Sequence, residues 1–123
     1  MADQVAQEYN ARYDPPARAK RKGYGDVIAT PNGGVSYERS SALYKKADGT
    51  PGIVRITATG ARNSDFDLAD TMLGLPETPA GYVWHHLDDY DVKSNTITMQ
   101  LVSVEAHNAA KPRPSSFRRF PRN

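Results

Sequence analysis

Three histidines are the residues of this chain best suited to chemistry, and they fall close together in its C-terminal part. His85 and His86 end the run Gly81-Tyr-Val-Trp-His-His86, and His107 lies in the run Ser103-Val-Glu-Ala-His-Asn108. A neutral imidazole is the commonest protein ligand for zinc, nickel and other late transition metals, and it also titrates near physiological pH. One histidine can therefore hold a metal while its neighbour accepts a proton from water. These residues predict a metal site with a spare imidazole beside it.

Two strands and a helix must position these histidines. Residues 81–86 and 96–102 are runs of β-branched and aromatic residues bounded by polar turn residues, and Ser103 can cap a short helix through Ala110. If the strands pair as a hairpin and the helix packs back across them, all three histidines converge on one small patch. The alternative is that the adjacent pair are ordinary strand residues, one in the core and one at the surface, and that the third is a solvated helix residue.

The wider pattern has a counterpart in a known family. The run ending in Trp-His-His is followed by Thr98-Met-Gln-Leu-Val102 and then by His107-Asn108, and it is preceded by Thr59-Gly-Ala-Arg62 and Asp65-Phe-Asp-Leu-Ala-Asp70. This pattern resembles the WHH branch of the HNH/endonuclease VII superfamily, the metal-dependent ββα nucleases often found as toxin domains of bacterial polymorphic toxins. The resemblance spans about residues 35–110. It implies a small α+β domain that ends in a ββα-metal (His-Me finger) motif.

The resemblance also implies roles. His85 and His107 would bind one divalent metal ion, either Zn, Ni, Mn or Mg, and His86 would act as the general base. The implied activity is endonucleolytic hydrolysis of DNA, with RNA as the other candidate substrate. The implied setting is a secreted antibacterial effector in which this domain is part of a larger carrier, is translocated into a target cell, acts in its cytoplasm and is neutralised by a cognate immunity protein.

The chain departs from the family pattern after Asn108. Relatives commonly carry a further histidine a few positions beyond the helix histidine, but this chain reads Ala109-Ala-Lys-Pro-Arg-Pro-Ser-Ser116. Either Arg113, fixed between two prolines, grips the substrate phosphate in its place, or this copy is weakened or inactive. Two alternatives to an active nuclease therefore stay open: an inactive domain that binds nucleic acid, and a structural cargo domain of a larger toxin.

The charge distribution favours a polyanionic partner. Residues 1–22 carry five basic and three acidic residues, residues 23–110 carry six and eleven, and residues 111–123 carry five and none. Phosphate contacts supply most sequence-independent affinity for nucleic acid. The alternative for each basic end is a solubilising segment. The candidate phosphate contacts, besides Arg113, are Lys20, Arg21, Lys22, Lys111, Arg118, Arg119 and Arg122.

Length and composition limit the remaining possibilities. At 123 residues the chain is one domain, which we divide into an N-terminal segment with a basic linker, residues 1–25, and a nuclease-like domain, residues 26–123. There is no cysteine, so nitrogen and oxygen atoms must bind any metal. No apolar run approaches the length needed to cross a bilayer, and the first residues lack the apolar core of a secretory leader, so no membrane partner is expected.

The rest of the sequence predicts a few further elements. Residues 1–13 have loosely helical spacing ended by Asp14-Pro-Pro16, a strand or extended stretch falls within 35–44, Asp48-Gly49 forms a tight turn, and 53–59 is a strand. Ser64 is expected to cap a short helix that ends at Gly74. The acidic residues on this helix are more simply cap and dipole partners than metal ligands, and those of the 87–95 loop more simply a solvated turn. They are Asp65, Asp67 and Asp70 on the helix, and Asp88, Asp89 and Asp91 in the loop.

The basic C-terminal segment leads to a prediction about DNA affinity. Deleting Phe117 to Asn123 removes Arg118, Arg119 and Arg122, so affinity should fall and the log-log salt slope should flatten by up to about three units if all three contact phosphates. Fluorescence anisotropy with labelled duplex at several salt concentrations measures both quantities, and metal affinity should not change. An unchanged slope would assign the segment to a solvated end or to an immunity-protein contact.

Overall fold

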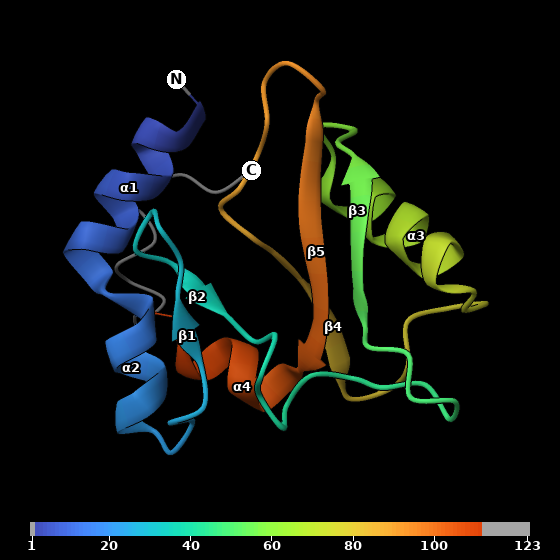
Figure 1. Ribbon diagram of the computed structural model, residues 1–123, viewed down its shortest axis with the longest axis horizontal. Helices are drawn as coiled ribbons and strands as arrows, with labels where there is room; N and C mark the ends of the chain where they lie inside the picture. The colour runs from blue at the N-terminus through green and yellow to red at the C-terminus, as the bar shows by residue number, and fades with distance from the viewer. Residues whose placement is uncertain (1, 112–123) are drawn as a thin grey trace.

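The computed structural model describes the backbone of residues 2–111 and the side chains of residues 7–111, so Arg113, Arg118, Arg119 and Arg122 lie outside the described residues. Its elements follow one another as shown in Figure 1. They are α1 (Ala2–Tyr13), α2 (Pro15–Arg21), β1 (Ile28–Ala29), β2 (Val35–Ser36), β3 (Ile53–Thr57), α3 (Arg62–Leu73), β4 (Tyr82–His86), β5 (Thr96–Ser103) and α4 (Val104–Ala109).

A three-stranded antiparallel sheet is the centre of the fold, and β5 is its middle strand (Figure 1). Both neighbours pair with β5, β3 from Ile53 opposite Gln100 and β4 from Tyr82 opposite Ser103. The Ser103 hydroxyl accepts a hydrogen bond from the Ala106 amide and starts α4. The predicted strand, loop, strand and helix at the C-terminal end are confirmed, as is the α+β class.

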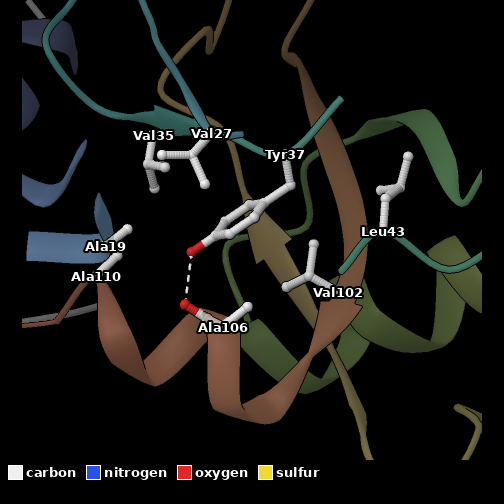
Figure 2. Packing of buried hydrophobic residues seen from close by; sticks show 8 residues of the cluster. All are labelled: Ala19, Val27, Val35, Tyr37, Leu43, Val102, Ala106 and Ala110. Carbon is white, nitrogen blue, oxygen red and sulfur yellow. Dashed lines mark hydrogen bonds between the residues drawn. The ribbon is translucent and has the colours of Figure 1, made fainter. Parts of the chain in front are cut away.

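Side chains alternate along the sheet and build two separate cores. Trp84, Met99 and Leu101 point to one face, where α3 packs on β3 and β5. Val102 points to the other face, where β1, β2, α2 and α4 gather around Tyr37 (Figures 1 and 2). Every one of these five side chains has at most 1% of its surface exposed, so each face of this small sheet carries a core, as the period of two along a strand allows.

Gln100 ties the central strand to the two-stranded sheet of β1 and β2. Its amide is almost fully buried, accepts a hydrogen bond from the Tyr37 amide at 2.8 Å and donates one to the Ser36 hydroxyl at 2.9 Å. The Tyr37 phenol then donates to the Ala106 carbonyl of α4 at 2.9 Å (Figure 2). Burial, with a smaller effect from Tyr24, raises the pKa of Tyr37 far above its usual range, so this phenol stays a donor.

The N-terminal part of the chain contains a second helix that the sequence analysis did not predict. Asp14 ends α1 in a left-handed conformation with φ of 49°, as the predicted helix end requires, but Pro15 and Pro16 then open a second helix. Proline suits this place because the first helical amides have no acceptor within the helix. The linker predicted within residues 1–25 is therefore wrong for residues 17–21, which belong to α2, and Ala19 is fully buried in the core around Tyr37.

Three other elements can be compared with their predictions. The turn at 46–50 and the strand β3 are confirmed. The strand expected within 35–44 is only Val35–Ser36, because the next residues turn toward the sheet. The predicted cap at Ser64 is wrong: α3 starts at Arg62, and its N-cap Ala61 has no side-chain oxygen to offer.

Asp88 fastens the N-terminal part of the fold to the loop after β4. Its Oδ2 accepts hydrogen bonds from the Asn10 side chain at 3.0 Å, the Thr30 hydroxyl at 2.6 Å and the Gly34 amide at 3.0 Å. Its carbonyl accepts another from the Asn32 side chain. This carboxylate is neither a metal ligand nor a solvated turn residue, since its acceptor positions hold α1 and the β1–β2 turn in place.

Asp88→Ala should therefore destabilise the protein. Three donors lose a shared acceptor in a partly buried place, which should lower the free energy of unfolding by about 2–4 kcal/mol. The matched control is Asp91→Ala in the same loop, where the exposed side chain accepts only from the Lys93 amide among the hydrogen bonds of the described residues, and where the loss should stay below about 1 kcal/mol. Urea unfolding followed by tryptophan fluorescence gives both values, and equal losses would refute the role of Asp88.

Candidate functional site

The alternation along β4 sends the adjacent histidines to opposite faces of the sheet. His85 follows Val83 to the face covered by α4 and the β1–β2 sheet, while His86 follows Tyr82 and Trp84 to the face covered by α3. The expected convergence of all three histidines is therefore wrong. The structure brings together His85 and His107, and it places His86 in separate surroundings.

His85 and His107 form a pair of imidazoles between β4 and α4. Their ring centroids lie 5.4 Å apart with an angle of 66° between the planes. His107 is buried, with 8% of its surface exposed, and the buried Tyr37 ring packs edge-on against His85 at 5.3 Å. The helix histidine is thus not the solvated residue of the alternative interpretation.

The protonation of His85 follows from its partner. Its Nε2 lies 2.9 Å from the Val35 carbonyl oxygen, which can only accept a hydrogen bond, so Nε2 carries the proton. In the neutral ring the lone pair then belongs to Nδ1. Histidines that bind metals commonly donate their other ring N–H to a carbonyl in this way, which fixes the tautomer and the ring orientation.

The donor set of this pair fits a divalent transition metal. The two imidazole rings are in contact, and each offers a nitrogen ligand of the kind that zinc, nickel, copper and iron bind readily. Among residues 7–111, no group of three or more histidine, aspartate or glutamate side chains is arranged to hold a metal. Within the described residues, this pair supplies two nitrogen ligands to such a metal.

His86 pairs with Asp65 of α3. Its Nε2 lies 2.9 Å from Asp65 Oδ2, and its ring packs on Phe66 with centroids 5.8 Å apart. Burial raises the pKa of Asp65, but hydrogen bonds from Thr59 and His86 outweigh it and hold that pKa below its ordinary value. Asp65 is therefore ionised at neutral pH, and His86 keeps about a third of its side chain exposed.

Trp84, the first residue of the Trp-His-His run, is a structural anchor. Its indole donates to Asp70 Oδ1 at 2.7 Å, and Thr78 donates to Asp70 Oδ2 at 2.7 Å. Asp65 lies in the first turn of α3, where the predicted dipole partner would lie, but neither buried acid of this helix caps its N-terminus with a side-chain hydrogen bond. Each is bonded to a β4 side chain, Asp70 to Trp84 and Asp65 to His86.

Asp89, in the loop after β4, also has structural partners. Asp89 accepts from Arg55 at 2.8 Å and from the Thr98 hydroxyl and amide, an exposed ion pair combined with strand contacts. Burial raises the pKa of Asp89, but the hydrogen bonds from Thr98 and the charge of Arg55 leave it below its ordinary value. This carboxylate belongs to the sheet and not to the histidine pair.

The predicted phosphate contacts are only partly described. Lys20 and Arg21 at the end of α2 and Lys22 just after it are exposed, and Lys111 is half-buried directly after α4. Another cation lies beside an aromatic neighbour of His86: Arg62 packs over the Phe66 ring at 5.2 Å, and that ring packs on His86. Sequence analysis did not single out this arginine, although it lies in the lead-in that carries the family resemblance.

A family model matches residues 76–112, and its description is a nuclease of the HNH/ENDO VII superfamily with conserved WHH. The matched segment begins just before β4 and contains β4, β5 and α4, hence all three histidines. A search of curated proteins and a search of solved structures each gave no match. Nucleases of this superfamily generally use a divalent metal ion.

None of the helices in the described part of the chain combines the length and the apolar character needed to cross a membrane.

The split of the histidines over two faces predicts a split in metal affinity. His85→Ala and His107→Ala should each weaken binding of Zn²⁺ or Ni²⁺. The loss should exceed the roughly 10–100-fold that follows when a metal ligand loses its own hydrogen-bond partner. His86→Ala should leave the affinity close to that of the parent, because its ring lies on the other face. Isothermal titration calorimetry of the four proteins compares them, and an equal loss in all three variants would overturn the assignment.

Proposed function

We propose that this chain is a DNA endonuclease and the toxin domain of an antibacterial effector. The proposal is supported by the match of residues 76–112 to the WHH family of the HNH/endonuclease VII superfamily, metal-dependent phosphodiester hydrolases that act on nucleic acid. In this proposal the domain is delivered into a target cell by a larger carrier, acts in the cytoplasm there, and is neutralised in the producing cell by an immunity protein. The toxin setting rests on the family resemblance.

One observation carries the catalytic part of the proposal. A pair of imidazoles lies on one face of β4, and a third imidazole, bonded to a buried carboxylate, lies on the other. β4 is an edge strand, and among the described residues no further strand pairs with its outer side. A phosphodiester lying across this edge can meet ligand histidines from one side and a base from the other.

The residues have distinct roles in this reaction. His85 and His107 would hold the divalent cation, which supplies positive charge to the phosphate and to the leaving oxygen. His86 is the general base: its Nε2 is engaged by Asp65, so its Nδ1 is the nitrogen that takes the proton from the attacking water. The P–O bond to the leaving 3′-oxygen breaks as the bond to the water oxygen forms.

Basic residues would bind the nucleic acid backbone. Lys20, Arg21 and Lys22 offer an exposed group of cations at the end of α2, and the C-terminal arginines beyond residue 111 supply further positive charge. Arg113 remains our proposed phosphate ligand in place of the histidine that relatives carry. An immunity protein would neutralise the enzyme by covering either these cations or the edge of β4.

Cleavage of supercoiled plasmid tests the proposal. The purified chain should nick and linearise plasmid with Mg²⁺, Mn²⁺, Ni²⁺ or Zn²⁺ and should stop in EDTA, while His86→Ala should lower the rate by about 10²–10⁴-fold, the usual contribution of a general base. Arg39→Ala is the control, an exposed residue that is not a partner in the hydrogen bonds found for His85 and His86. A structured RNA assayed in parallel decides the substrate class.

The same assay distinguishes the alternatives. Salt-dependent DNA binding without cleavage at any metal would make the domain a nucleic-acid-binding module. If the domain neither binds nor cleaves DNA, the remaining function is that of a structural cargo domain. A His86→Ala variant that cuts as fast as the parent would remove His86 from catalysis.

A further inference from the structure

In the proposed reaction Asp65 engages Nε2 of His86, but the carboxylate is assigned no role of its own. Asp65 Oδ2 lies 2.9 Å from His86 Nε2, and only 6% of the Asp65 surface is exposed. We propose that Asp65 is a positioning residue, which selects the Nε2–H tautomer of His86 and fixes the orientation of its ring so that Nδ1 faces the reacting water. This inference rests on the proposed role of His86 as general base.

The two carboxylate oxygens of Asp65 have different partners, and this fixes which oxygen faces His86. Oδ1 accepts hydrogen bonds from the Thr59 amide at 2.8 Å and from the Thr59 hydroxyl at 2.7 Å. A backbone amide can only donate, so whatever occupies the Oδ1 position must accept. The two oxygens are therefore committed to different partners, Oδ1 to the segment before α3 and Oδ2 to the histidine.

The helix holds the carboxylate rigidly at the sheet. Asp65 lies four and eight residues before Ala69 and Leu73, so it shares their face of α3, and both of these residues are buried in the core against β3 and β5. The Phe66 ring packs on the His86 ring. The imidazole is thus confined by a hydrogen bond at one nitrogen and by an aromatic contact on its ring.

Replacing Asp65 by asparagine should reverse the tautomer. The Thr59 amide requires the asparagine oxygen at the Oδ1 position, so the NH2 group must take the Oδ2 position and point at His86 Nε2. Two N–H groups cannot bond to each other, so Nε2 must become the acceptor and the proton must move to Nδ1. The nitrogen that should take a proton from water would then already carry one, as in the aspartate-to-asparagine change of the serine protease triad.

The chain offers a matched control in Asp70→Asn. Asp70 lies on the same helix, is equally buried with 6% of its surface exposed, and is bonded to Trp84 and Thr78 and to no histidine. Its asparagine can accept from the indole with its oxygen and donate to the threonine hydroxyl with its NH2 group. A purely structural effect of losing a buried charge on α3 should appear in both variants.

Two measurements on the full chain test the inference. In ¹⁵N NMR of histidine-labelled protein, His86 should change from the Nε2–H to the Nδ1–H form in Asp65→Asn and should keep the parent pattern in Asp70→Asn, with His86→Ala assigning the signals. In plasmid cleavage, kcat should fall on the order of 10²–10⁴-fold in Asp65→Asn with KM nearly unchanged. It should stay near the parent value in Asp70→Asn.

An unchanged His86 tautomer in Asp65→Asn overturns the inference, and so does a loss of kcat that Asp70→Asn matches. The NMR measurement needs no catalysis, so it still decides the role of Asp65 if His86→Ala cuts like the parent and the proposed function fails. Conversely, a reversed tautomer with an unchanged kcat would support Asp65 as the residue that sets the tautomer and would refute His86 as the base.

Discussion

The antiparallel pairing of β4 with β5 is the constraint on which the site depends. Because side chains alternate along a paired strand, the register that buries Trp84 against α3 must send His85 to the opposite face and must return His86 to the α3 face. Two neighbouring residues thus acquire different partners, a backbone carbonyl for one and a buried carboxylate for the other. The division of labour that we propose between metal ligand and base rests on this strand geometry.

Each histidine is consequently supported by a different core. The ring of His85 lies between Tyr37 and His107, and Tyr37 is held in turn by Gln100 and by the Ala106 carbonyl. On the other face, α3 places its two buried acids against β4 side chains. Each imidazole therefore takes its neighbours from a different core, although both share the same strand.

Local patterns in the sequence predicted much of the fold. Strands β3, β4 and β5, the 46–50 turn and the Ser103 cap of α4 are local features with clear residue preferences, and the structure has them all. The convergence of three histidines failed because it set aside the period of two that the same strand prediction implies. The second helix was missed because Pro15 and Pro16 read as a helix end, although proline is equally suited to a helix start.

The pairing of Asp65 with His86 could not be predicted from the sequence, because it depends on how α3 packs across the sheet. A signal was nevertheless present. An aspartate spaced four and eight residues before Ala69 and Leu73 falls on the apolar face of its helix, and a charge in that position needs a buried partner. Such an acid is better read as half of an unseen contact than as a cap.

The carboxylate of Asp88 has a consequence for how this domain can be cut from a longer chain or fused to one. It joins Asn10 of α1 to the residue two places beyond His86, and Ala19 of α2 fills the core beside Tyr37. A fragment beginning at residue 26 would keep every histidine yet lose the helices that brace the loop leaving β4. The smallest portable unit of this enzyme therefore includes α1 from the turn that carries Asn10, and a fusion partner is better joined ahead of that turn than at the basic segment.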